Sequence, residues 1–324
     1  MPQSFLHPCT RRASFAISIN MASTNLPVGR IRVGISGWNY APWRGVFYPA
    51  KLPHTKELAY AAGNFSTIEI NGTFYSLQRP TSFARWAATT PEGFVFSIKG
   101  SRYITHMLRL RNVEQALANF FASGLLLLGP KLGPILWQFP PNFSFDASLL
   151  ENFFQLLPRT TPEAAILSRR HDSRLDGRAH TEAGKNRPLR HAIEIRHDSF
   201  LSRDFIRLLR RHRIALVCAD TVSWPRLVDA TTDFVYCRLH GSRELYASGY
   251  GPKALATWAD RIAAWATGDP PSGKRVSAFG PTEAHPHNVY VYFDNDMKVR
   301  APADALSLVR RLARFGLLDS PPKS

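Results

Sequence analysis

His-Ala-Ile-Glu-Ile-Arg-His-Asp-Ser, residues 191–199, alternates apolar and charged side chains: Ile193 and Ile195 are separated by Glu194 and followed by Arg196. Successive side chains of a β-strand point to opposite faces, so the isoleucines would share one face and the charges the other. A solvated edge strand would show the same alternation. The rest of the chain decides between an edge strand and a strand whose charged face is enclosed.

The same phase recurs in other β-rich runs, each of which carries polar residues near its C-terminal end. The runs are 31–38 with Ser36, 67–75 with Glu69 and Asn71, 94–100 with Ser97 and Lys99, 135–140 with Gln138, 215–220 with Asp220, 234–241 with Arg238 and His240, and 289–296 with Asp294. A closed parallel barrel explains this repetition, because its outward residues pack on helices while its inward residues turn polar toward the end that carries the site. The sequence therefore predicts an α/β fold, a single (β/α)8 TIM-like barrel.

The length and composition agree with one barrel and its tails. The chain has 324 residues, of which 44% are hydrophobic, and such a barrel needs about 250 residues. We assign the barrel domain to residues 31–318 and expect residues 319–324 to be a fraying tail. Residues 1–30 are rich in Ser and basic residues and predict a disordered or non-native extension, with Met21 as an alternative translation start to Met1.

The charge of the chain bears on its partners. The formal net charge is +17, from 41 basic and 24 acidic residues, which favours a phosphorylated small molecule or nucleic acid as partner, although a basic enzyme from an Arg-rich proteome would look the same. Residues 168–190 hold many arginines and few apolar residues, which predicts a mobile basic insertion on the face opposite the usual site.

Cysteine usage and hydropathy limit the location. Cys9, Cys218 and Cys237 are odd in number and lack metal-binding spacing, so we expect a reducing, cytoplasmic compartment without a disulfide framework. No apolar run approaches the roughly 20 residues of a membrane span, so no membrane partner is expected. Nothing in the sequence indicates a protein partner.

Several short motifs occur in an order that matches a known family. They are Gly34-Ile35-Ser36-Gly37-Trp38-Asn39-Tyr40, Glu69-Ile70-Asn71-Gly72-Thr73-Phe74-Tyr75, Gln138-Phe139-Pro140-Pro141, Glu194-Ile195-Arg196-His197, Arg238-Leu239-His240-Gly241 and Tyr292-Phe293-Asp294-Asn295-Asp296. The chain resembles the YecE-like family, a domain of unknown function (number 72), from about Arg32 to Leu312. The resemblance implies a (β/α)8 barrel but brings no established reaction. The chain departs from the family pattern at Asp294, where members of the family often carry asparagine.

The predicted inward set combines acids with bases, and the candidate catalytic residues are Glu194, Asp220, His240 and Asp294. Opposite charges that are crowded at a barrel mouth shift each other's pKa values and suit acid–base chemistry or the binding of a polar ligand. A buried salt-bridge network that holds the barrel in register would use the same residue types. Carboxylates and histidines also bind divalent metals, but no spacing motif supports a site, so the cofactor stays open.

Aromatic, amide and basic residues near the same mouth are candidates for substrate binding. They are Trp38, Tyr40, Asn71, Tyr75, Lys99, His106, Gln138, Arg196, Arg238 and Tyr250. We expect Arg238 and His240 to hold an anion, because many barrels bind phosphate after their seventh strand. The aromatic residues would stack on a base or sugar, or else form a packed lid.

These features favour an enzyme that acts on a phosphorylated or nucleic-acid substrate at the C-terminal mouth, with a phosphodiesterase-like hydrolase as one form. The alternative is a barrel that binds nucleic acid or anions without chemistry. The phase of the strands also predicts that Glu69, Asn71, Glu194 and Arg196 point into one cavity.

Overall fold

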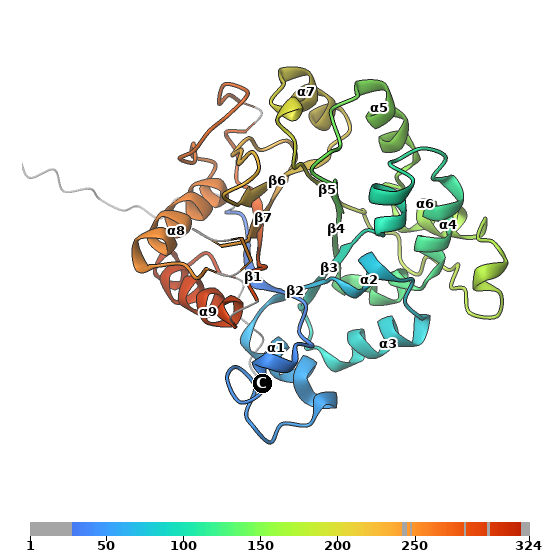
Figure 1. Cartoon of the computed structure of the whole chain (residues 1–324), viewed down its shortest axis with the longest axis horizontal. Helices are drawn as coiled ribbons and strands as arrows, with labels where there is room; N and C mark the ends of the chain where they lie inside the picture. Colours follow the sequence, from blue (N-terminus) through green and yellow to red (C-terminus); the bar gives the residue numbers. More distant parts are fainter. Residues whose placement is uncertain (1–27, 242–244, 247, 282, 297–298, 319–324) are drawn as a thin grey trace, which may run out of the picture.

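The computed structural model describes residues 28–241, 245–246, 248–281, 283–296 and 299–318. Within these residues the strands form a closed parallel barrel in sequence order (Figure 1). The strands are β1 (Ile31–Ser36), β2 (Thr67–Ile70), β3 (Val95–Lys99), β4 (Leu132–Gln138), β5 (His191–Glu194), β6 (Ala215–Asp220), β7 (Phe234–Leu239) and β8 (Asn288–Phe293). The predicted (β/α)8 barrel is confirmed. Most of the predicted extension and the whole of the predicted tail lie outside the described residues.

Helices surround the barrel, and each larger one packs on the outside of the strands (Figure 1). They are α1 (Glu57–Asn64), α2 (Gly72–Tyr75), α3 (Pro80–Thr89), α4 (Glu114–Ala122), α5 (Ala147–Leu156), α6 (Thr161–Ser168), α7 (Arg203–Arg211), α8 (Pro252–Thr267) and α9 (Arg300–Leu312). Asp146 caps α5, since its carboxylate accepts a 3.0 Å hydrogen bond from the backbone N–H of Leu149. None of the helices in the described ranges is long and apolar enough to cross a membrane.

Strand alternation separates two apolar cores. Outward residues of the strands pack with the helices, and in β5 and the residue after it these are Ile193 and Ile195. Inward residues form a second cluster inside the barrel, to which Ala192 belongs. Glu194 is fully buried and lies in phase with Ala192, so the charged face of the 191–199 run is enclosed. This result excludes the edge-strand alternative.

The basic segment 168–190 leads from the end of α6 into the N-terminal end of β5, on the side expected from the sequence. Leu175 in this segment is fully buried. The Asn119 side chain of α4 accepts a 3.0 Å hydrogen bond from the backbone N–H of Asp172, which attaches the segment to the helical layer. The mobility of this segment stays a prediction.

Candidate functional site

The centre of the C-terminal mouth is a buried ionic network around Arg238 of β7, whose side chain is fully enclosed. Its Nε and Nη2 atoms donate to the two carboxylate oxygens of Glu69, at 3.1 and 2.8 Å. Its Nη1 donates to Glu194 at 2.7 Å and its Nη2 also donates to Asp294 at 2.8 Å. One guanidinium therefore links carboxylates from β2, from β5 and from the end of β8.

Two carboxylates of this network, Glu194 and Asp294, are held in their ionised form. Burial alone would raise the pKa of Glu194, but Arg238 and Arg196 outweigh it and hold that pKa well below its usual range. Burial likewise opposes ionisation of Asp294, and Arg238 and His240 outweigh it, so the pKa of Asp294 is also lowered. Glu69 accepts further hydrogen bonds from Ser36 Oγ at 2.8 Å and Tyr236 Oη at 2.5 Å. Glu194 and Asp294 are therefore fixed charges at neutral pH.

This arrangement corrects the expected anion site at Arg238. Four of its hydrogen bonds go to carboxylates, and an incoming anion would meet their negative charges first. The geometry instead matches the alternative in which Arg238 neutralises the acids and holds the strands in register. Part of the turn after β7, which was expected to assist, lies outside the described residues.

Asp220 and Tyr250 also lie elsewhere than expected. Asp220 is in phase with Cys218, which belongs to the outer core. Its carboxylate accepts hydrogen bonds from Trp258 Nε1 of α8 at 2.9 Å and from Arg226 Nη1 at 2.5 Å. Tyr250 is buried, and burial followed by the charge of Asp220 raises the pKa of its hydroxyl. Both residues therefore stabilise the layer behind the mouth rather than the site itself.

Two of the predicted binding residues support Glu194. Gln138 Nε2 donates to Glu194 Oε1 at 2.9 Å, and Arg196 Nε donates to the same oxygen at 2.9 Å. Arg196 also donates to Tyr246 Oη at 3.1 Å, and its guanidinium lies 3.8 Å above the ring of Trp224. These contacts bring Glu194 and Arg196 together, and Arg238 links Glu69 to the same group. Asn71, which was expected in the same cavity, lines the separate pocket beside α2.

His240 lies between two ionised carboxylates. Its Nδ1 is 3.1 Å from Asp294 Oδ2 and its Nε2 is 3.7 Å from Glu194 Oε1. The ring N–H groups do not point along these directions, and neither nitrogen makes an aligned hydrogen bond to a residue in the described ranges. The ring is fully buried between these two carboxylates.

Lys99 supplies the cation of the mouth that is not tied by hydrogen bonds. Its Nζ lies 4.4 Å from the centre of the Phe74 ring, and the ammonium donates no hydrogen bond to the part of the chain that the structure describes. Burial, followed by repulsion from Arg238, lowers the pKa of Lys99 to about 8. Lys99 is therefore charged at neutral pH and has its N–H donors unused.

Asp296 is a functional candidate that the sequence interpretation did not select. Burial, followed by repulsion from Asp294, raises the pKa of Asp296 to about 6. The environment thus drives the pKa values of two nearby carboxyls apart, a pattern that marks acid and base pairs in enzymes. The signal in the sequence was the second acid of Asp294-Asn295-Asp296, which ends the 289–296 run in phase with Asp294.

An apolar pocket of about 250 Å³ opens beside α2 and brings together three predicted residues, Trp38, Tyr40 and Asn71. Trp38 packs edge to face on Trp86, with ring centres 5.4 Å apart. Asn71 Oδ1 is buried and has no hydrogen-bond partner among the described residues. The pocket therefore offers flat aromatic walls and one open acceptor, which suits a base or a sugar.

The remaining predicted residues, His106 and Tyr75, lie near Phe74. Burial, followed by repulsion from Arg196, lowers the pKa of His106 to about 4, so this ring is neutral at neutral pH. Its ring meets Phe74 edge to face at 5.1 Å. Tyr75 also packs edge to face on Phe74, but its side chain is largely exposed. Tyr75 is therefore available to a ligand only from outside the mouth.

The structure brings no metal-ligand set together in the described ranges, where His, Cys, Asp and Glu form no suitable group of three or more. The carboxylates that a metal would use are instead bonded to Arg238. The metal left open by the sequence therefore gains no support from this geometry.

Comparisons with known proteins agree on one family. The family model described as "Protein of unknown function DUF72" matches residues 32–324. UPF0759 protein YunF of Bacillus subtilis is 29% identical over 118 residues, which are 35% of this chain and 41% of YunF. UPF0759 protein YecE of Escherichia coli K12 is 28% identical over 129 residues, 40% of this chain and 44% of YecE. The matched stretches thus span about two fifths of the length of these relatives.

Solved structures show the same fold. A DUF72 family protein from Thermotoga maritima superposes with a TM-score of 0.67 and 24% identity, covering 88% of this chain and 99% of that one. A second, from Enterococcus faecalis, has a TM-score of 0.61 and 17% identity, covering 89% and 99%. At these identities the likeness concerns the fold alone.

Proposed function

We propose that this chain, which belongs to the DUF72 family of proteins of unknown function, is an enzyme that acts on a phosphorylated or nucleic-acid substrate at the C-terminal mouth of its barrel. The observation that carries the proposal is the buried Lys99 ammonium, which makes no hydrogen bond to the described residues and lies within electrostatic reach of Asp294, Glu69 and Glu194. A buried cation with open donors is a natural receptor for a phosphate oxygen.

The groups around Lys99 supply acid–base capacity. Asp296 has a pKa of about 6, so it is mostly ionised at neutral pH yet accepts a proton readily. His240 has both nitrogens free of aligned hydrogen bonds in the described structure and lies close to Asp294. In the proposed hydrolysis Lys99 holds a phosphate oxygen, while Asp296 or His240 takes a proton from the attacking water. The new P–O bond forms as the P–O bond to the leaving alcohol breaks, and the alcohol takes up a proton from solvent. The Arg238 network fixes the walls within which they act.

The aromatic pocket would hold the base or sugar of the same substrate. Asn71 lines this pocket and immediately precedes α2, and α2 carries Phe74, on which Lys99 lies. The pocket and the ammonium are thus connected by one helical turn. The net charge of +17 would attract a polyanion over long range.

A non-catalytic barrel that binds anions or nucleic acid is the second candidate. The observation in its favour is the engagement of Glu69, Glu194 and Asp294 by Arg238, which gives these carboxylates a structural role. A reducing, cytoplasmic location belongs to either proposal and fits the free thiols of Cys218 and Cys237, which are paired in register on neighbouring strands.

Turnover of a substrate panel tests the proposal. The panel contains a chromogenic phosphodiester, a chromogenic phosphomonoester and single-stranded DNA and RNA oligonucleotides, each assayed with added divalent metal and with chelator. Wild type is compared with Lys99→Met and with Arg207→Met, a matched control on the exposed face of α7. We expect Lys99→Met to lose at least about tenfold in kcat/KM, the effect of one charge-assisted hydrogen bond.

Equal rates in wild type and Lys99→Met would refute the assigned role of Lys99. Absence of turnover by wild type under every condition would refute the proposed enzymatic function. In that case oligonucleotide affinity at about 50 mM salt that falls steeply as salt rises would establish the binding barrel.

A further inference from the structure

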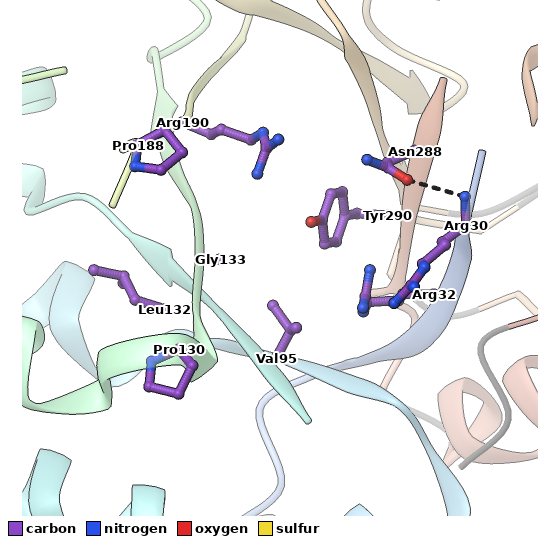
Figure 2. A pocket seen from close by; sticks show the side chains of 10 residues that line it. All are labelled: Arg30, Arg32, Val95, Pro130, Leu132, Gly133, Pro188, Arg190, Asn288 and Tyr290. Carbon is purple, nitrogen blue, oxygen red and sulfur yellow. Dashed lines mark hydrogen bonds between the residues drawn. The ribbon is translucent and has the colours of Figure 1, made fainter. Parts of the chain in front are cut away.

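A second pocket, of about 330 Å³, opens at the other end of the barrel, where the strands begin (Figure 2). Three arginines line it, and they come from two segments of the chain. Arg30 precedes β1, Arg32 lies within β1, and Arg190 immediately precedes β5. Asn288 and Tyr290 of β8 complete its polar lining. This volume falls at the lower end of the range for small-molecule sites.

The charge of this pocket is of one sign. No Asp or Glu is among the described residues that line it. Arg190 is bonded to Asp233 at 3.1 Å, but Asp233 is not part of the lining. In Figure 2 the guanidinium groups of Arg32 and Arg190 extend toward the open centre from opposite sides of the barrel. A negatively charged ligand in this centre would be attracted from both sides.

The Tyr290 hydroxyl gives an independent sign of a ligand. The Tyr290 side chain is 5% exposed, and Figure 2 shows its hydroxyl directed into the pocket. This hydroxyl makes no hydrogen bond to the described parts of the chain, although buried tyrosines usually find a partner. Tyr292, two residues further along β8, shows the usual behaviour: its hydroxyl lies 2.7 Å from both Thr67 Oγ1 and Ser97 Oγ.

The other polar groups are oriented for the same purpose. Asn288 Oδ1 accepts a 2.9 Å hydrogen bond from the backbone N–H of Arg30, which turns the amide nitrogen of Asn288 toward the pocket (Figure 2). The Arg32 guanidinium lies 5.7 Å from the centre of the Tyr290 ring. The pocket therefore presents N–H and O–H donors together with positive charge, which is the lining that an oxyanion requires.

We infer that this pocket is a binding site for a small phosphorylated compound, held through its phosphate group by Arg32, Arg190 and Tyr290. The site is separate from the C-terminal mouth and does not depend on the function proposed there. The start of the strands in such barrels more often serves stability than chemistry, so we assign this site to binding and not to catalysis. A bound phosphate would stabilise the fold, because it would bind the folded chain and not the unfolded one.

Calorimetry with inorganic pyrophosphate tests the site, at about 150 mM salt so that diffuse attraction is screened. Wild type is compared with Arg190→Met, with Tyr290→Phe and with the control Arg207→Met. Each titration is repeated in a Lys99→Met background, which removes the cation of the mouth. We expect affinity to fall by at least about tenfold in Arg190→Met, by a smaller factor in Tyr290→Phe, and not at all in Arg207→Met.

Tyr290→Phe keeps the ring and its packing, so it reports on the hydroxyl even if Arg190→Met folds poorly. Thermal melting gives a second readout, since pyrophosphate should raise the Tm of wild type and of Lys99→Met alike. Unchanged affinity in both Arg190→Met and Tyr290→Phe would overturn the inference. Loss of all binding in Lys99→Met alone would place the anion at the mouth instead, and would overturn the inference while leaving the proposed function intact.

Discussion

Both ends of the barrel carry charged side chains, but the two ends differ in the ratio of acidic to basic residues. At the C-terminal mouth, Arg238 is surrounded by the carboxylates of Glu69, Glu194 and Asp294. At the opposite end, the described lining contains Arg30, Arg32 and Arg190 but no carboxylate. At the mouth, the ion pairs with Arg238 fix the three carboxylates in place and leave only a few groups for a substrate. The described lining of the opposite end instead presents positively charged groups to a ligand.

A layer of tyrosines separates the two ends. The hydroxyl of Tyr292 lies 2.7 Å from Thr67 Oγ1 and 2.7 Å from Ser97 Oγ. Tyr236 packs on Tyr292, with ring centres 5.0 Å apart, and donates to Glu69 on the mouth side. Because this layer is buried and bonded, we expect a substitution at one end to leave the other end unchanged.

The largest effect is expected for Arg238→Met. The substitution keeps much of the volume but leaves Glu69, Glu194 and Asp294 without their shared cation. Removing one partner of a buried ionic network costs about 3–5 kcal/mol of unfolding free energy. Urea unfolding measures this loss, with Arg207→Met as the control. A loss below about 1 kcal/mol would mean that Arg238 does not hold the barrel together, and would remove the contrast between the ends.

A smaller effect is expected for Asp220→Asn, which tests the outward placement of this residue. The substitution weakens hydrogen bonds from Trp258 and Arg226, and the loss should be about 1–3 kcal/mol of unfolding free energy. Turnover at the mouth should persist at the wild-type rate. If stability is retained while turnover is abolished, Asp220 belongs to the site after all.

The pH dependence of turnover distinguishes the free groups of the mouth from its fixed charges. Asp296 must be ionised to accept a proton, so kcat/KM should rise with pH up to about 6. Lys99 must be protonated to hold phosphate, so kcat/KM should fall above pH of about 8. Each limb approaches a tenfold change for every pH unit. Asp296→Asn should remove the acidic limb, and an acidic limb that survives this substitution would contradict the assignment.

The smallest effect is expected for Trp38→Phe in the aromatic pocket. Phenylalanine keeps an aromatic wall but loses area against a base, so oligonucleotide affinity should weaken by about 0.5–1.5 kcal/mol. Pyrophosphate has no base, and its affinity should not change. Fluorescence anisotropy with a labelled oligonucleotide measures the first effect and calorimetry the second. An equal loss for both ligands would indicate that Trp38 supports the fold and not the base.

The sequence revealed the fold because polar residues alternate with isoleucines in its strands. Glu194 is flanked by Ile193 and Ile195, so its inward phase was readable. Asp220 was misplaced because β6 is apolar on both faces: Val217 fills the barrel while Cys218 joins the outer core. Because polar and apolar residues do not alternate in β6, its sequence does not show whether Asp220 points into the barrel or toward the helices.

The partners of the charged residues were harder to predict than the side of the strand on which each residue lies. Arg238 is separated from Glu69 by 169 positions and from Glu194 by 44, so its partners follow from barrel closure and from no local pattern. The N-terminal pocket has the same character, since Arg32, Arg190 and Tyr290 meet only when the barrel closes. Composition showed the excess of positive charge but not where it gathers.

Anomalous diffraction from crystals soaked in tungstate, a heavy analogue of phosphate, tests the contrast between the two ends most directly. We expect one anion beside Lys99 in the mouth and another in contact with Arg32, Arg190 and Tyr290, with none bound to Arg238. Tungstate bound directly to Arg238, or absent from both predicted positions while present elsewhere on the protein, would contradict this expectation.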